Sequence, residues 1–315
     1  MYTIGMDIGG TSTVFGIVDE SGKIIASNSV KTQCYFKLDD YIDRVSDCIK
    51  QMMRSAQLTT CDIRGLGIGA PNGNYYRGTI EYAPNLPWKG IVIPLAELFR
   101  TSLGGIPVTV TNDANAAALG EKKYGVAKDI DHFIMITLGT GVGSGIVIDG
   151  KLLYGHDGFA GELGHVIVRP EGRLCGCGRR GCLETYCSAT GIATTARERL
   201  NETDTPSVLR SIRSEELTSK DIYSAAMMGD ELAINIFKET GTILGEALAD
   251  MVVFSNPEAI ILFGGLAKAG DFILCPTQAA MEAKMLNVFK GKTRLLLSEL
   301  KDADAAILGA SALAW

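Results

Sequence analysis

The chain has 315 residues, a length that suggests two domains or one unusually large domain. Hydrophobic residues make up 46% and charged residues 21%, near the globular average, which excludes disordered, collagen-like and coiled-coil proteins. The net charge of −6 argues against a nucleic-acid partner, since binding a polyanion needs a basic face. No apolar run approaches the ~20 residues that span a bilayer, and the chain does not begin like a signal peptide. We therefore expect a cytoplasmic protein with no membrane partner.

Short strand-like runs and one helical repeat are found in the first 111 residues. Strands are predicted at Tyr2–Ile8, Val14–Asp19, Ile24–Val30, Gly65–Gly69 and Val108–Thr111. Between Leu38 and Met53 the apolar residues recur three and four positions apart, which predicts an amphipathic helix. Strands that alternate with helices indicate an α/β fold.

The second half of the chain begins like the first. The segment Ile4–Asp19 and the segment Ile134–Asp149 each read as an apolar strand, a Gly/Thr turn and a returning strand. Self-similarity at half the chain length indicates a duplicated domain. The remaining predicted elements are helices at Ala189–Leu200, Glu231–Phe254, Phe272–Val288 and Ala303–Ala314, and strands at Ala259–Phe263 and Arg294–Leu297.

The two Gly/Thr turns are candidate phosphate-binding sites. In the first, Gly9 and Gly10 expose backbone N–H groups, Thr11 adds a hydroxyl, and Asp7 could hold a hydrated Mg²⁺ ion. In the second, around Gly139–Gly145, glycines recur every second residue, a spacing that fits neither the Rossmann nor the Walker motif. Either turn alone could be an ordinary hairpin. Two related turns in duplicated halves favour a cleft that grips one polyphosphate from both sides.

A histidine and three closely spaced cysteines form a candidate metal site, made of His165, Cys175, Cys177 and Cys182. One imidazole and three thiolates are the ligands of a closed, structural zinc site, which has no open position for catalysis. The alternative is three free thiols in a loop. The nearby Arg173, Arg179 and Arg180 are interpreted as solvated surface residues.

These motifs together resemble the ROK family of sugar kinases and repressors, most closely its glucokinases. The resemblance rests on the first turn, Asn112–Asn115, the second turn, Glu162–His165 together with the loop Cys175–Cys182 (the cysteine loop), and Leu262–Gly265. It implies two ribonuclease-H-like domains that flank a cleft for sugar and MgATP. The small domain would comprise residues 1–112 and 302–315, and the large domain, with the zinc loop, residues 113–301.

The resemblance also implies roles for single residues. Asp113 matches the catalytic base that takes the proton of the sugar 6-hydroxyl, although an Asn-Asp pair also commonly caps a helix. The residues that match sugar contacts are Asn85, Asn112, Glu162, His165 and Glu184. The residues that match nucleotide contacts are Gly9, Gly10, Thr11, Thr140 and Gly141 on the phosphates and Gly264 and Gly265 on the adenosine side. The sequence Ala70-Pro71-Asn72-Gly73 departs from the family, in which Gly commonly follows Pro directly.

We therefore expect ATP-dependent phosphorylation of a hexose at its 6-hydroxyl, with D-glucose as acceptor, Mg²⁺ as cofactor and a structural Zn²⁺ ion. A kinase for N-acetylmannosamine, allose or fructose stays open. A sugar-responsive repressor is disfavoured, since the first turn begins at Asp7 and leaves no room for a DNA-binding segment in front. The family is commonly dimeric or tetrameric, so a homo-oligomer is expected. Zinc removal should weaken sugar binding more than ATP binding, because the phosphate turns lie elsewhere in the chain.

Overall fold

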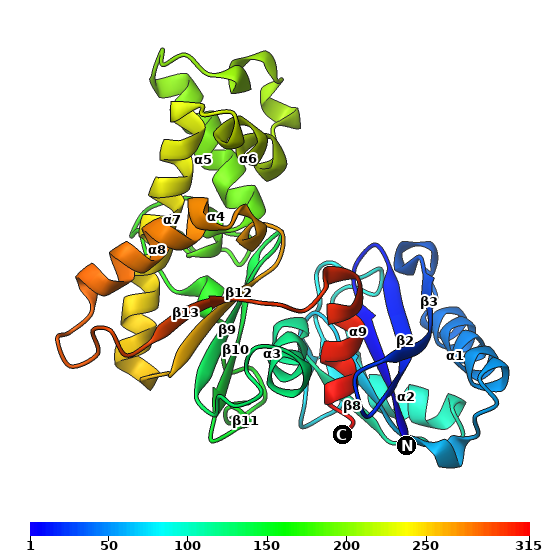
Figure 1. Cartoon of the computed structure of the whole chain (residues 1–315). Coiled ribbons are helices and arrows are strands. Elements are labelled where there is room, and N and C mark those ends of the chain that lie inside the picture. The colour runs from blue at the N-terminus through cyan, green and yellow to red at the C-terminus, as the bar shows by residue number, and fades with distance from the viewer. The chain divides into compact units, whose positions relative to one another are not determined.

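The computed structural model covers residues 1–315 and describes the side chains of residues 1–301 and 304–315. The chain divides into two compact units (Figure 1). The first consists of Met1–Asp131, Gly145–Gly161 and Glu299–Trp315, and the second of His132–Ser144 and Glu162–Ser298. These units do not share the boundaries predicted for the two domains. Since compact units and family domains divide a chain by different criteria, the predicted domain boundaries stay a prediction.

A five-stranded mixed sheet forms the centre of the first unit. Its strands are β1 (Tyr2–Ile8), β2 (Thr13–Asp19), β3 (Ile24–Val30), β4 (Ile63–Gly69) and β8 (Val108–Thr111). They are arranged in the order β3-β2-β1-β4-β8. Strands β1, β2 and β3 pair antiparallel, whereas β1, β4 and β8 run parallel, so the ends of β1, β4 and β8 meet at one edge.

The alternation of side chains along β1 separates a core face from a functional face. Ile4, Met6 and Ile8 point into an apolar core with helices α1 (Leu38–Ser55) and α2 (Leu95–Ser102). On the opposite face, α9 (Asp302–Ala312) packs on β1 and β4, and α3 (Asp113–Tyr124) packs against α9. This close packing requires glycine, because a Cβ at Gly5 would lie 1.9 Å from the Ile307 carbonyl oxygen.

The second sheet repeats the topology of the first, which confirms the predicted duplication. Its strands are β9 (Phe133–Leu138), β10 (Val142–Ile148), β11 (Lys151–Leu152), β12 (Ala259–Phe263) and β13 (Arg294–Leu297). The order β11-β10-β9-β12-β13 corresponds strand by strand to the first sheet. Strand β12 again runs parallel to both of its neighbours, β9 and β13.

Helices supply most of the core of the second unit. They are α4 (Glu184–Cys187), α5 (Ala189–Glu202), α6 (Ser219–Met227), α7 (Glu231–Ser255) and α8 (Asp271–Lys284). Helices α7 and α8 pack closely along each other, because glycines on α7 let α8 approach: a Cβ at Gly245 would lie 2.2 Å from the Thr277 carbonyl oxygen. The prediction that the helix beginning near Phe272 continues to Val288 was wrong. The helix ends because Met285 is extended; Met285 itself stays buried in the core of the second unit, whereas Leu286 and Val288 are exposed.

Short elements complete the fold. The sequence patterns did not predict helices α2, α4 and α6, strand β11, or a small sheet of β5 (Gly73–Asn74), β6 (Thr79–Glu81) and β7 (Val92–Ile93). Strands of two or three residues carry no readable periodicity. Among the helices of the described residues, none has both the length and the apolar character needed to cross a membrane.

Candidate functional site

In the first unit, two predicted site carboxylates lie on either side of a glycine. Asp7 on β1 pairs in register with Gly69 on β4, and Gly69 pairs with Thr111 on β8, two residues before Asp113. A Cβ at Gly69 would lie 3.4 Å from Asp7 Oδ1 and 3.5 Å from the Asp113 Cα. Asp7 and Asp113 therefore both lie next to Gly69, within van der Waals reach of a Cβ at that position.

The environment of these carboxylates favours their neutral forms. Burial, and secondarily the charge of Asp113, raises the pKa of Asp7 to about 7. Although part of the Asp113 side chain is exposed, the density of protein around it raises the pKa of its carboxyl as well. Raised carboxyl pKa values are typical of groups that accept protons near neutral pH.

The helix cap at this site is Asn112 and not Asp113. Asn112 is the N-cap residue of α3, and its Oδ1 accepts a hydrogen bond of 2.8 Å from the Asn115 backbone N–H. Asp113 is the first helical residue, and its Oδ1 accepts a bond of 2.9 Å from the Ala114 N–H. The backbone N–H of Ala114 thus orients the Asp113 carboxylate.

The first Gly/Thr turn lies against the segment that carries Asn85. The Gly9 N–H donates to the Ser12 carbonyl (2.9 Å) and closes the turn, while Thr11 is exposed. A Cβ at Gly10 would lie 2.5 Å from the Asn85 carbonyl oxygen. A predicted phosphate contact and a predicted sugar contact are therefore neighbours in space.

In the second unit, two predicted nucleotide turns follow neighbouring parallel strands. The turn with Thr140 and Gly141 follows β9, and Gly264 and Gly265 follow β12. Gly264 has φ +101°, and a Cβ there would lie 2.8 Å from the Leu138 carbonyl oxygen at the end of β9. Ligands commonly bind beyond the carboxyl ends of adjacent parallel strands.

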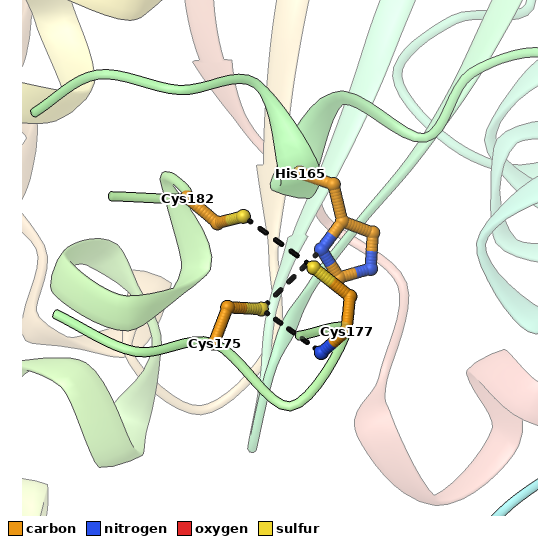
Figure 2. A group of neighbouring side chains, drawn as sticks. All are labelled: His165, Cys175, Cys177 and Cys182. Atoms are coloured by element: carbon orange, nitrogen blue, oxygen red, sulfur yellow. Dashed lines mark hydrogen bonds between the residues drawn. The ribbon is translucent and has the colours of Figure 1, made fainter. Parts of the chain in front are cut away.

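The four predicted metal ligands converge, as Figure 2 shows. Their ligand atoms all lie within 4.8 Å of one another. Cys177 Sγ lies 3.7 Å from Cys182 Sγ, and Cys175 Sγ lies 3.6 Å from His165 Nδ1. A tetrahedral zinc ion places two thiolate sulfurs about 3.8 Å apart, and a sulfur and an imidazole nitrogen about 3.6 Å apart. Donor set and spacing thus fit zinc.

The cysteine loop owes its shape to backbone pairing and to glycine. The Cys175 N–H donates to the Arg179 carbonyl (2.8 Å), and the Gly181 N–H donates to the Arg173 carbonyl (2.8 Å). Gly178 and Gly181 have positive φ angles of 86° and 78°. At Gly181 a Cβ would also lie 1.8 Å from the Arg169 carbonyl oxygen, so only glycine fits.

The interpretation of Arg173 as a solvated residue was wrong. Its side chain is 14% exposed and forms an ion pair with Glu198 on α5. The guanidinium also donates to the Thr185 carbonyl (2.7 Å) and lies 4.5 Å from the centre of the Tyr186 ring. Arg173 therefore fastens the cysteine loop to the segment that carries Glu184. An arginine two residues before a ligand cysteine was the only signal in the sequence.

Two of the predicted sugar contacts in the second unit, His165 and Glu184, lie at the metal cluster. His165 ends a short 3₁₀ helix, Leu163–His165, that Glu162 precedes, and it turns Nδ1 toward the cysteines. Glu184 begins α4, and its Oε1 lies 3.0 Å from Cys175 Sγ and 3.7 Å from His165 Nδ1. The structure thus gathers His165 and Glu184 at one place.

Two homologous sheets with this strand order define the actin/hexokinase-like class of fold, as in ROK hexokinases of known structure. The family model described as ROK family matches residues 3–315, and the chain belongs to this family.

Several relatives show what the chain is similar to. A glucokinase of Thermotoga maritima is 35% identical over 313 residues, which cover 98% of this chain and 96% of the relative. The crystal structure of a ROK family glucokinase from Streptomyces griseus in complex with glucose and AMPPNP has 34% identity and a TM-score of 0.81, covering 99% of each chain. A xylose repressor of Bacillus subtilis is 29% identical over 322 residues, covering 99% of this chain and 76% of the relative.

Proposed function

We infer that the protein is a sugar kinase, and we propose that it transfers the γ-phosphoryl group of ATP to the 6-hydroxyl of D-glucose. The pairing of Asp7 and Asp113 across Gly69 carries this proposal. Phosphoryl transfer needs an oriented nucleophile and neutralised phosphate charge, and these two carboxylates are suited to one task each. The glucokinase relatives favour glucose among the hexoses.

Asp113 is proposed as the general base. With one oxygen held by the Ala114 N–H, its carboxylate accepts the 6-hydroxyl proton while the sugar oxygen forms its bond to the γ-phosphorus and the bond to ADP breaks. The raised pKa of Asp113 brings its basicity closer to that needed near neutral pH. Asn85, Asn112, Glu162, His165 and Glu184 are proposed to hold the other sugar hydroxyls, since amides, imidazoles and carboxylates discriminate donors from acceptors.

The nucleotide is assigned to the turns. Gly9, Gly10, Thr11, Thr140 and Gly141 are proposed to hold the phosphates, and Gly264 and Gly265 to accommodate the adenosine. The contact between Gly10 and the Asn85 carbonyl supports this assignment, because a transferring phosphate and its acceptor must be neighbours. Asp7 would hold Mg²⁺, which when bound offsets phosphate charge.

A structural zinc ion is proposed at His165, Cys175, Cys177 and Cys182. The tetrahedral spacing of the sulfur and nitrogen atoms supports it. With Nδ1 directed to the metal, the other ring nitrogen of His165 is fixed as an N–H donor for a sugar hydroxyl.

The test is ADP formation with MgATP over a panel of hexoses and acetamido-hexoses, followed by phosphorus NMR of the product. We expect the highest kcat/KM with glucose and a 6-phosphate product. The matched control is 6-deoxyglucose, which keeps the other hydroxyls and should bind without being phosphorylated. A higher kcat/KM with another sugar would refute the glucose assignment, and no sugar-dependent ADP formation would refute the kinase.

A further inference from the structure

The second Gly/Thr turn is fastened to the helices that follow the cysteine loop. The Ala189 N–H donates to the Gly139 carbonyl (2.8 Å), and the Thr190 hydroxyl donates to the Thr140 carbonyl (2.8 Å). Both donors stand at the start of α5, directly after α4 and Glu184. The turn therefore does not hold its shape alone; it depends on where α4 and α5 lie.

Glu184 connects this turn to the metal cluster. One carboxylate oxygen, Oε1, accepts a hydrogen bond from Cys175 Sγ at 3.0 Å. The other oxygen faces the turn, since a Cβ at Gly141 would lie 2.7 Å from Oε2. A side chain at position 141 would displace the carboxylate, so the glycine is needed for the contact itself.

The segment that carries the fourth candidate ligand, His165, also contacts the second Gly/Thr turn. A Cβ at Gly164, beside His165, would lie 2.0 Å from the Val142 carbonyl oxygen. The Leu163 N–H donates to Ser144 Oγ at 3.1 Å. Residues on both sides of the four candidate ligands of Figure 2 therefore contact residues 139–144: Leu163 and Gly164 before them, and Glu184 after them.

We propose that the metal cluster and the second Gly/Thr turn, hereafter the phosphate turn, form one coupled unit. Metal occupancy sets the conformation of residues 139–144, and nucleotide binding in turn slows metal loss. This inference rests on the proposed function, which assigns Thr140 and Gly141 to the nucleotide. A bound ion fixes the separation of His165 and Cys175 and takes the place of the Cys175 thiol proton that Glu184 accepts, so metal binding acts on Gly164 and Glu184, which lie on either side of the turn. Coupling between two sites is reciprocal, so an ion that strengthens nucleotide binding is itself bound more tightly, by the same factor, when the nucleotide is present.

The coupling replaces the expectation drawn from the sequence that zinc removal affects mainly the sugar. The phosphate turn is far from the cysteine loop along the chain, yet Gly141 and Glu184 are neighbours in space. Metal loss should therefore weaken nucleotide binding as well as sugar binding.

The first experiment follows zinc release from the zinc-loaded wild-type protein into a chromophoric chelator, with and without Mg²⁺ and a non-hydrolysable ATP analogue. We expect the analogue to slow zinc release by roughly 5-fold or more, because a gain in zinc affinity in the lower range of allosteric coupling appears in the release rate when the rate of zinc binding is unchanged. Calorimetry with the same analogue separates the two hypotheses. If the analogue does not bind, the proposed function fails. If it binds and zinc release is unchanged, the coupling is overturned while the kinase stands.

Two pairs of variants locate the coupling. Gly141→Ala should speed zinc release because its methyl group displaces Glu184, whereas Gly139→Ala should release zinc at the wild-type rate, since a Cβ there meets nothing within 4 Å. Thr190→Val removes the donor to the turn and should reduce the effect of the analogue on zinc release. Its control is Thr194→Val, whose hydroxyl donates to the Thr190 carbonyl within α5.

Circular dichroism establishes that each variant is folded. If Gly141→Ala does not fold, the threonine pair decides the question alone. Equal zinc release and an equal analogue effect in both members of each folded pair would overturn the proposal.

Discussion

Replacing Asp7 by Asn should stabilise the ligand-free protein above neutral pH. Asp7 is half-buried on β1, faces Asp113, and has a pKa raised by burial to about 7 from an ordinary value of 3.8. An acid with a higher pKa in the folded than in the unfolded chain stabilises the fold fully below the unfolded pKa. That contribution is lost as the pH rises from about 4 to about 7.

The size of the effect follows from the shift. A pKa difference of about three units corresponds to a ceiling of about 4 kcal/mol. Because the Asp7 side chain is only partly shielded from water, screening reduces the expected gain of Asp7→Asn to roughly 2 kcal/mol at pH 8. At pH 4, where the carboxyl is largely protonated in the folded protein, the gain should be small.

The assay is urea unfolding near pH 4, 6 and 8, without Mg²⁺ or nucleotide. The control is Asp62→Asn. The Asp62 carboxylate accepts hydrogen bonds from the Thr59 N–H and hydroxyl, which lower its pKa, so this variant should lose stability at pH 8. A gain for Asp7→Asn that does not change with pH, or a loss at pH 8, would refute the reasoning.

Four further predictions test the site. Asp113→Asn should lower kcat on glucose by ~10²–10⁴-fold, since it removes a positioned base; near-normal steady-state kinetics would leave that residue without a catalytic role. Gly10→Val should weaken both glucose and nucleotide binding by calorimetry, because its Cβ meets the Asn85 carbonyl at 2.5 Å; an unchanged glucose Kd would contradict this. Arg173→Ala should lower the free energy of unfolding by about 2–3 kcal/mol, more than Arg180→Ala, since it leaves charge-assisted hydrogen bonds unmade; equal losses would show no fastening role. Mass spectrometry should find about one zinc ion per chain, and its removal should raise the KM for glucose and lower the Tm reversibly; full activity of metal-free protein would refute the zinc site.

Apolar patterning was sufficient to predict most strands of the two five-stranded sheets. Strands β1, β3, β8, β12 and β13 have the predicted bounds. Most of them are short runs rich in apolar or β-branched residues, and β3, which carries Ser27, Asn28 and Ser29, follows the Ser21-Gly22 turn. The duplication was visible because the same strand, turn and strand sequence occurs twice. The packing of helices on glycine was not visible in the sequence, since nothing there indicates that Gly5 and Gly67 lie beneath α9.

The metal cluster was the part of the site most readable from sequence, because the spacing of its cysteines limits where the sulfurs can lie. The contacts that hold the cysteine loop in place could not be predicted from the sequence. Arg173 looks like any surface arginine until the positions of Thr185, Tyr186 and Glu198 are known. Its role depends on three segments that converge only in the folded chain.

The contact between Gly141 and Glu184 shows why sequence separation is a poor guide to coupling. The glycine belongs to a turn after β9, and the glutamate begins a helix after the cysteine loop. The two segments are joined by a hydrogen bond from the Ala189 backbone N–H to the Gly139 carbonyl. Because it joins two backbone groups, this contact cannot be predicted from the types of the residues. Because that bond orients α4 and α5, the carboxylate of Glu184 faces the metal ligands with one oxygen and the turn with the other. A residue assigned to the sugar by its motif is thus also placed to transmit the state of the metal to the phosphate turn.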